Sequence, residues 1–118
     1  MPGRTVTLID DDPEILQSFR FWLALEGYRV TAYPSALLFL ADPYSAPSCM
    51  IVDHHMAGMT GLELAEHLRV TGRSIPFLLL TGALSPSIAT AAARIGIAGV
   101  LEKPPADNDV LKFIAAHT

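Results

Sequence analysis

Strand-like and helix-like segments alternate along the whole chain, and this alternation limits the possible folds more than any other feature of the sequence. The predicted strands are short apolar or alternating segments: 5–9, 28–32, 49–52, 77–81 and 100–101. Each is followed by apolar residues at intervals of three or four, which is the spacing of one helix face. Strands that alternate with helices form a parallel sheet with right-handed crossovers and helices on both faces. The predicted fold class is therefore α/β, a doubly wound parallel sheet of five βα units.

The predicted helices begin at residues that commonly cap helix N-termini. The candidate caps are Asp12, Ser35, Thr60, Ser85 and Asp107. Proline follows two of them at the first helical position, and Glu63 completes a capping box with Thr60. Three helices are predicted to end at Gly27, Gly72 and Gly96. The helix 35–40 contains four consecutive apolar residues, so the pattern leaves its buried side open.

The composition is that of a globular domain that by itself binds neither a membrane nor a nucleic acid. The 118 residues are 51% hydrophobic and fit one domain, 1–118. The formal net charge is −4, and the chain has only two lysines and no basic cluster. No apolar run approaches the roughly 20 residues that span a bilayer, and a signal-peptide pattern is missing at the N-terminus. The single cysteine, Cys49, lies in an apolar run, so we expect a buried, inert thiol and a cytoplasmic location.

Polar side chains gather where the predicted strands end. Asp10 and Asp11 follow the first strand, Asp53 the third, Thr81 closes the fourth, and Lys103 follows the fifth. In open α/β sheets the functional crevice lies beyond the carboxyl ends of the strands. One edge of the sheet is therefore expected to collect three carboxylates, a hydroxyl and an ammonium.

This set of groups suits a metal ion and a phosphoryl group. Carboxylates placed close together repel one another, which raises the pKa of some of them unless a cation is near. Oxygen ligands favour Mg²⁺, which is usually held by one or two carboxylates together with a phosphate. The ammonium of Lys103 and the hydroxyl of Thr81 can receive phosphoryl oxygens, and an aspartate can act as the nucleophile and form an acyl phosphate. The combination predicts Mg²⁺-dependent phosphoryl chemistry at this edge.

Four segments carry a family resemblance: LIDDDPEIL (8–16), IVDHHMAGMTGLEL (51–64), PFLLLTG (76–82) and GVLEKP (99–104). In this order and spacing, the sequence resembles the receiver domain of bacterial two-component response regulators over essentially its whole length. The resemblance implies a flavodoxin-like fold with strand order 2-1-3-4-5. It also implies a site at the switch between the first and third strands.

The resemblance assigns the phosphoryl-binding residues. Asp53 would be the phosphoacceptor, and Thr81 would hydrogen-bond a phosphoryl oxygen with help from the Gly82 amide. Lys103 would pair with another phosphoryl oxygen. The Lys103–Pro104 peptide would be cis, a form that is accessible chiefly before proline.

The resemblance also assigns the metal ligands and the partners. Asp11 would bind Mg²⁺ directly, Asp10 largely through water, and Asp53 and the backbone carbonyl of His55 would complete the protein ligands. The phosphoryl donor would be a phosphohistidine on a sensor kinase or phosphotransfer protein. The domain would catalyse its own phosphorylation and slow dephosphorylation without being an enzyme in the usual sense.

The signal would leave through the fourth helix, fifth strand and fifth helix. A homodimer through this surface is one option, with candidate contacts Ile88, Ala91, Ile95 and Phe113. The sequence is compatible both with a DNA-binding output domain outside this chain and with a stand-alone receiver.

Three positions depart from the family pattern. Alanine stands at 57, where proline is usual, and should loosen the loop after Asp53. Val100 stands where an aromatic switch residue is usual, so the signal is predicted to run through the loop after Thr81 and the fourth helix. His55 can activate the water that attacks the acyl phosphate or merely offer its carbonyl. The side chains of the adjacent histidines, His54 and His55, are expected to point apart, which disfavours chelation of one transition metal.

Two other functions compete with this interpretation. A phosphatase of the haloacid-dehalogenase type also forms an aspartyl phosphate, and residues 10–12 contain its D-x-D pattern. That enzyme needs Thr or Val at position 14, where this chain has Glu14, and a longer chain. A receiver-like docking module that works without phosphate is the second alternative, motivated by Ala57 and Val100.

Overall fold

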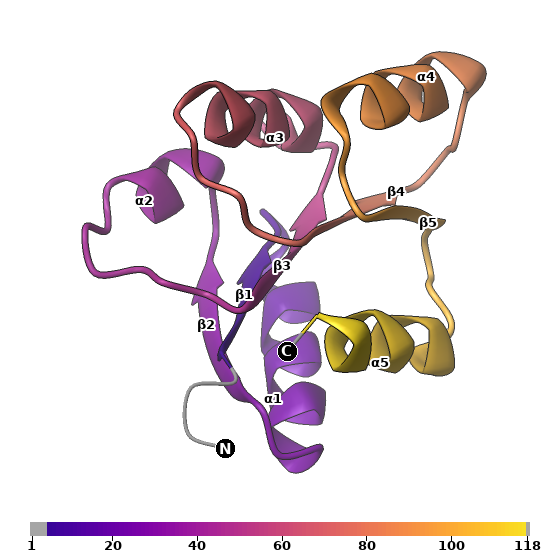
Figure 1. Ribbon diagram of the computed structural model, residues 1–118. Helices are drawn as coiled ribbons and strands as arrows, with labels where there is room; N and C mark the ends of the chain where they lie inside the picture. Colours follow the sequence, from indigo (N-terminus) through magenta and orange to yellow (C-terminus); the bar gives the residue numbers. More distant parts are fainter. Residues whose placement is uncertain (1–4, 118) are drawn as a thin grey trace.

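The computed structural model describes residues 5–117 and contains five parallel strands with five helices (Figure 1). The elements in chain order are β1 Thr5–Ile9, α1 Pro13–Leu25, β2 Arg29–Tyr33, α2 Ala36–Leu40, β3 Cys49–Asp53, α3 Gly61–Val70, β4 Phe77–Thr81, α4 Pro86–Ile95, β5 Gly99–Glu102 and α5 Asp107–Ala116. The strand order is β2-β1-β3-β4-β5, and every neighbouring pair is parallel. The predicted α/β class and strand order are therefore confirmed.

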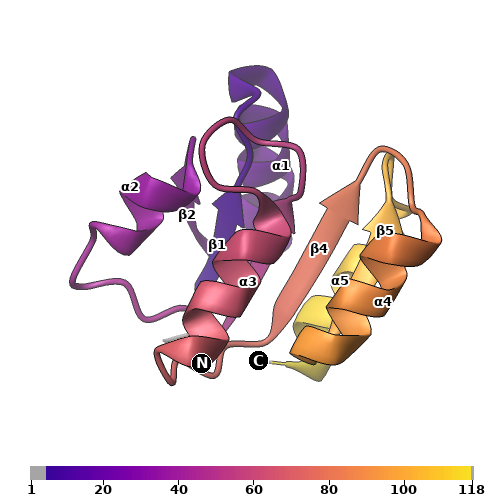
Figure 2. The same ribbon diagram turned by 90° about the horizontal axis from the view of Figure 1, so that it is seen from above.

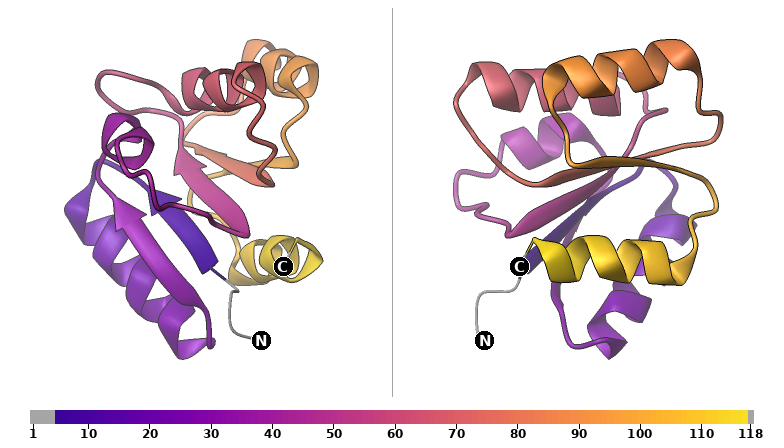
Figure 3. Two further views of the ribbon diagram at one scale, coloured as in Figure 1. Left: turned by 60° about the vertical axis from the view of Figure 1, so that its left-hand side comes forward. Right: turned by 45° about the vertical axis from the view of Figure 1, so that its right-hand side comes forward.

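The helices form two layers that cover opposite faces of the sheet. Helices α1 and α5 lie on one face, and α2, α3 and α4 lie on the other (Figures 1 and 3). Helices α3 and α4 lie side by side across the sheet (Figure 2), and the Arg94 guanidinium joins them by an ion pair to Glu66 at 3.1 Å. Because both faces are covered, β3 and β4 are buried along their whole length.

Two hydrophobic cores fill the spaces on either side of the sheet. One packs α2, α3 and α4 and includes Phe39, Met50, Val52, Leu64 and Leu79. The other packs α1 and α5 and includes Val6, Leu8, Leu23, Ile51 and Ile114. In α2, Ala36 and Phe39 face the core, whereas Leu37 and Leu38 are exposed. The sequence pattern did not decide which side of this helix is buried, and the structure shows that it is the side of Ala36 and Phe39.

Burial corrects part of the predicted dimer surface. Ile95 and Phe113 each belong to a hydrophobic core and are only 9% exposed. They contribute to packing of α4 and α5 and are not available as surface contacts. Ile88 and Ala91 are half-buried. Cys49 is fully buried as predicted, and burial raises the pKa of its thiol to about 12.

Four of the five predicted helix caps are present. Asp12, Ser35 and Ser85 accept backbone N–H bonds from the first turn of their helices, and Thr60 forms the complete capping box with Glu63. The fifth prediction was wrong: Ala106 occupies the cap position of α5, and Asp107 is the first helical residue. An aspartate in the first turn still favours the helix through the dipole. The strand bounds also agree closely with the prediction. Strands β1 and β4 have the predicted bounds, β2 is shifted by one residue, and β5 is longer than predicted by one residue at each end.

Among residues 5–117, no helix combines the length and hydrophobicity that a bilayer crossing requires.

The buried hydroxyl of Thr7 yields a first test of the packing. Thr7 lies in the middle of β1, is fully buried, and its Oγ1 has no hydrogen-bond partner among residues 5–117. Replacing Thr7 with valine is expected to raise the free energy of unfolding by about 1 kcal/mol, because the shape is kept and an unsatisfied polar group is removed. Urea unfolding measures the change. Thr31→Val is the matched control, since Thr31 lies beside Thr7 on β2 but is exposed; a destabilised Thr7→Val protein would contradict the assignment.

Candidate functional site

The carboxyl ends of four strands bring the predicted site residues to one edge of the sheet. Asp53 and Thr81 are the last residues of β3 and β4, and these strands are neighbours. Asp10 directly follows β1, and Lys103 directly follows β5. The apolar residues of β1, β3 and β4 are followed directly by Asp10, Asp53 and Thr81, so these polar residues stand at the rim of the sheet. Strand β5 ends in Glu102, and Lys103 is the residue after it.

Lys103 holds two of the carboxylates together. Its Nζ lies 3.1 Å from Asp10 Oδ2 and 3.1 Å from Asp53 Oδ1. The Lys103 side chain is 24% exposed, whereas the side chains of Asp10 and Asp53 are 8% and 5% exposed. The Lys103 backbone N–H donates to the Thr81 carbonyl at 2.8 Å, and the Lys103–Pro104 peptide is cis. The ammonium therefore reaches the strand ends from a fixed backbone position.

The charges of the site perturb one another. Burial raises the pKa of Asp53, and the nearby Asp10 carboxylate adds to this, whereas the hydrogen bond from Lys103 opposes it. Burial by itself would lower the pKa of Lys103, but its hydrogen bonds to Asp10 and Asp53 outweigh burial, so the pKa of Lys103 is raised. Lys103 is therefore protonated at neutral pH. Its positive charge offsets only part of the cost of a buried negative charge on Asp53.

Three carboxylates can be ligands of one cation. Asp10, Asp11 and Asp53 each offer an oxygen, and these atoms lie within 4.8 Å of one another. All-oxygen donors with an exposed member, Asp11, suit a hard cation such as Mg²⁺ that keeps water ligands. The residues present therefore fit Mg²⁺. Asp10 is oriented through its Oδ1, which accepts the Asp12 backbone N–H at 3.0 Å. A metal-ligand role for the His55 carbonyl stays a prediction.

The two histidines differ from the expectation that their side chains point apart. Their ring centroids are 4.9 Å apart in an edge-to-face arrangement, because the chain leaves the extended conformation directly after Asp53. His54 Nδ1 accepts the Leu62 backbone N–H at 3.4 Å, at the start of α3. His55 Nε2 lies 3.3 Å from the hydroxyl of Thr81. The ring nitrogens in these bonds have partners in two different elements, the first turn of α3 and the end of β4.

Thr81 and Gly82 lie at the other side of the crevice. Thr81 is fully buried, and its hydroxyl also exchanges hydrogen bonds of 3.3 Å with the carbonyl and N–H of Ala83. Gly82 is exposed, with open space around its α-carbon. Sequence reasoning missed the Thr81–His55 contact. The only sequence signal was the histidine two residues after Asp53.

Asp53 also makes the stability depend on pH. Because the pKa of Asp53 is raised in the folded protein, the folded state keeps a proton that the unfolded chain releases near its ordinary pKa of about 3.9. Its contribution to the free energy of unfolding should therefore decrease as pH rises from about 3.9 through the folded pKa. Asp53→Asn is expected to remove this decrease and to stabilise the protein at pH 7 by about 1 kcal/mol, since Lys103 keeps Asp10 as a partner.

Urea unfolding between pH 3.5 and pH 7, without Mg²⁺, measures this difference. Asp109→Asn on the exposed side of α5 is the control for removal of one negative charge. A wild-type and an Asp53→Asn protein with parallel pH profiles would contradict the raised pKa.

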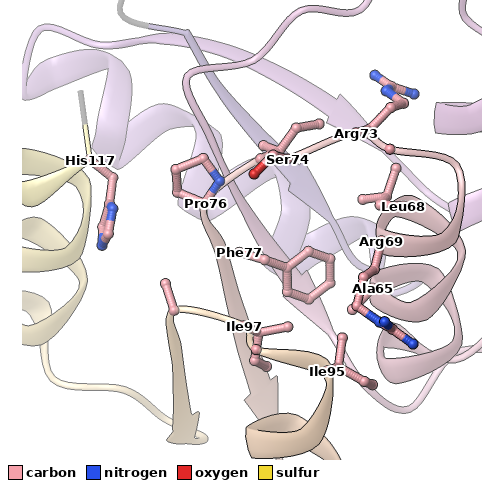
Figure 4. A pocket seen from close by; sticks show the side chains of 14 residues that line it. Ala65, Leu68, Arg69, Arg73, Ser74, Pro76, Phe77, Ile95, Ile97 and His117 are labelled. Atoms are coloured by element: carbon pink, nitrogen blue, oxygen red, sulfur yellow. The ribbon is translucent and has the colours of Figure 1, made fainter.

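A second hollow lies at the opposite edge of the sheet (Figure 4). It is formed by the end of α3, the start of β4 and the turn before β5, and Leu68, Phe77, Ile95 and Ile97 are among its lining residues. Its lining contains no carboxylate, so it cannot hold a hard cation in the way the carboxyl edge can.

The protein is thus a doubly wound parallel sheet whose carboxyl edge brings together three carboxylates, an ammonium and a hydroxyl. The model of the response regulator receiver domain matches residues 6–115, and the chain belongs to this family. Receiver domains act in phosphorylation-based signal relays with histidine kinases, generally use Mg²⁺, and are signalling domains more than enzymes. The family match sets aside the haloacid-dehalogenase interpretation.

Curated relatives and solved structures agree with the family. The transcriptional regulatory protein FixJ of Azorhizobium caulinodans is 34% identical over 112 residues, which cover 94% of this chain and 53% of the relative. The response regulator protein TodT of Pseudomonas putida strain F1 is 30% identical, covering 94% and 49%. The chain thus spans about half the length of these curated relatives.

Among solved structures, the FixJ-N crystal structure has a TM-score of 0.87 at 30% identity, covering 98% of this chain and 93% of that one. The chemotaxis protein CheY4 of Vibrio cholerae has a TM-score of 0.86 at 27% identity, covering 97% and 98%. These similarities support the flavodoxin-like fold.

Proposed function

We propose that residues 1–118 form one receiver domain in which Asp53 accepts a phosphoryl group from a phosphohistidine of a sensor kinase or phosphotransfer protein in the cytoplasm. The observation that carries this proposal is the position of Lys103, whose Nζ is 3.1 Å from both Asp10 and Asp53. The ammonium offsets the negative charge of Asp53 and remains able to pair with a phosphoryl oxygen once Asp53 is phosphorylated.

Each residue of the site has a role in the transfer. An oxygen of the Asp53 carboxylate attacks the phosphorus, and the bond from phosphorus to the donor imidazole nitrogen breaks with its electron pair left on that nitrogen. The Thr81 hydroxyl and the Gly82 N–H donate to one phosphoryl oxygen, and Lys103 pairs with another. Asp10, Asp11 and Asp53, with the His55 carbonyl, would hold Mg²⁺. When bound, this ion supplies positive charge against the carboxylates and the phosphoryl oxygens.

The acyl phosphate is then hydrolysed slowly when water attacks the phosphorus and the Asp53 carboxylate leaves. The His55 ring stands two residues from the nucleophile, but its Nε2 is paired with Thr81 in this structure. The backbone N–H of His55 hydrogen-bonds the Asp53 carboxylate and lowers its pKa in part. The side chain contacts Thr81 in this structure, and activation of the attacking water by His55 stays a prediction.

A groove beside the site offers a place for the donor protein. It lies between α1 and the segment before α5, and its wall includes Ile15, Phe19 and Trp22 together with Lys103 and Pro104. The groove is mainly apolar and ends at the lysine of the site, so a donor that packs against it would bring its phosphohistidine to the carboxyl edge. This supports a protein phosphoryl donor.

The signal is proposed to leave through the loop after Thr81 and α4. The loop is held by the Leu84 N–H, which donates to the Glu102 carboxylate at 3.3 Å, and α4 is held to α3 by the Glu66–Arg94 ion pair. Val100 is half-buried against the core, and a stiff β-branched side chain cannot swing as an aromatic ring does. The surface of α4, β5 and α5 would contact a second copy of the chain or an output domain. The relative named a transcriptional regulatory protein supports a DNA-binding output outside this segment.

Incubation with acetyl phosphate and Mg²⁺, followed by intact mass measurement, tests the proposal. Wild-type protein is expected to gain one phosphoryl group, and Asp53→Asn is expected to gain none. Beryllofluoride with Mg²⁺ should bind the wild type and fail to bind Asp53→Asn. A wild-type protein that is folded yet neither gains phosphate nor binds beryllofluoride would overturn the proposal in favour of the phosphate-independent docking module.

A further inference from the structure

The His55 ring joins the two loops that flank the phosphoacceptor. His55 belongs to the loop after β3, and its Nε2 lies 3.3 Å from the hydroxyl of Thr81 at the end of β4. The neighbouring His54 ring packs edge-to-face against it and is itself tied to α3 through the Leu62 N–H. A chain of contacts therefore runs from the start of α3 across the mouth of the site to Thr81.

The hydroxyl of Thr81 is fully engaged in this arrangement. It pairs with His55 and exchanges hydrogen bonds with Ala83 in its own loop. A phosphoryl oxygen can only accept, so a new bond to it must take the single hydroxyl proton of Thr81 from its present acceptor. That acceptor is the Ala83 carbonyl or, when the proton of the His55 ring is on Nδ1, His55 Nε2. In that tautomer His55 Nε2 is the acceptor that can leave, because the His55 side chain is exposed whereas the Ala83 carbonyl is fixed in the same loop as Thr81.

We infer that His55 is a positioning residue that holds Thr81 in the unphosphorylated arrangement and releases it when a phosphoryl group forms on Asp53. The inference rests on the proposed function of Asp53 and Thr81, and it assigns the ring of His55 to the loop after β4. Phosphorylation then does two things at once: it recruits the Thr81 hydroxyl and frees the loop after Asp53 from the loop after Thr81.

Two substitutions of His55 distinguish the effect of its hydrogen bond to Thr81 from the effect of its aromatic ring. His55→Phe keeps an aromatic ring beside His54 but loses the bond to Thr81, and His55→Gln keeps a polar nitrogen at similar reach. His67→Phe on the exposed side of α3 is the matched control for loss of a histidine. Beryllofluoride affinity in the presence of Mg²⁺ is measured by titration. The χ1 rotamer of Thr81 is measured by NMR couplings without beryllofluoride.

We expect His55→Phe to bind beryllofluoride about 5-fold more tightly than wild type, because one competing hydrogen bond of about 1 kcal/mol is removed. Without beryllofluoride, the Thr81 rotamer should be averaged in His55→Phe, while His55→Gln recovers the wild-type rotamer and affinity. Equal affinities and an unchanged rotamer in His55→Phe would overturn the inference. A wild type that binds no beryllofluoride would instead refute the proposed function, and the Thr81 rotamers would then decide the role of His55 independently.

Discussion

Replacing Lys103 with glutamine is expected to lower the free energy of unfolding by about 3 kcal/mol at neutral pH and to abolish stable phosphorylation of Asp53. The ammonium is the partner of two carboxylates that are 8% and 5% exposed, and both would be left without it. Removing one partner of a buried ion pair is costly because the remaining charge stays uncompensated. Urea unfolding and intact mass after acetyl phosphate treatment measure the two effects.

The decrease in the free energy of unfolding caused by Lys103→Gln should become smaller at high pH. The pKa of Lys103 is raised in the folded protein, so its contribution is fully present below about pH 10.4 and is lost as pH rises through the folded pKa. At acidic pH the Asp53 carboxyl group, whose pKa is raised, becomes protonated, and the difference from wild type should shrink. Lys112→Gln is the matched control, because Lys112 is the other lysine and is exposed on α5. Equal stabilities of the two variants at pH 7 would contradict the role given to Lys103.

Replacing Gly61 with alanine is expected to destabilise the protein by about 3 kcal/mol and to displace Asp53. A β-carbon built on Gly61 would lie 2.8 Å from the Asp53 carbonyl oxygen, 3.0 Å from His54 Cα and 2.6 Å from Leu79 Cδ1. The leucine methyl can move, but the other two atoms are backbone atoms of Asp53 and His54. Overpacking of a well-packed interior costs about 1–3 kcal/mol, and here the obstacle is backbone.

The Gly61→Ala prediction is checked by urea unfolding together with the NMR amide signals of residues 53–56. Gly82→Ala is the control, since a β-carbon at Gly82 meets nothing within 4 Å and the Gly82 φ is compatible with alanine. We expect Gly82→Ala to remain within about 0.5 kcal/mol of wild type. A Gly61→Ala protein of wild-type stability with unmoved amides near Asp53 would show that the close approach of α3 is not required.

Local sequence patterns were sufficient for the fold and for the convergence of the site. Asp12, Thr60 and Ser85 cap helices where their side chains and the following prolines or glutamate predicted. Because parallel strands present their carboxyl ends on one side, the order of polar residues after the strands already placed Asp10, Asp53 and Thr81 together. These features depend on backbone chemistry and strand direction, which a single sequence displays.

Other features depend on contacts between segments far apart in the chain and could not be predicted in this way. The pairing of His55 with Thr81 and the ring contact of His54 with His55 arise from the conformation of a loop without a regular pattern. Ala106 replaces Asp107 as the cap because the approach of the chain to α5 decides which residue stands first. The burial of Ile95 and Phe113 follows from the way α4 and α5 pack on the sheet.

Chemical mapping of the phosphorylated residue tests the central claim most directly. The protein is treated with acetyl phosphate and Mg²⁺ and then with borohydride, which reduces an aspartyl acyl phosphate to homoserine, and the peptides are sequenced by mass spectrometry. The site described above predicts homoserine at position 53 and nowhere else, with none in a sample that was not phosphorylated. Homoserine at position 10, 11 or 12, or a stable phosphate on a serine or threonine, would contradict the assignment of Asp53 as the phosphoacceptor.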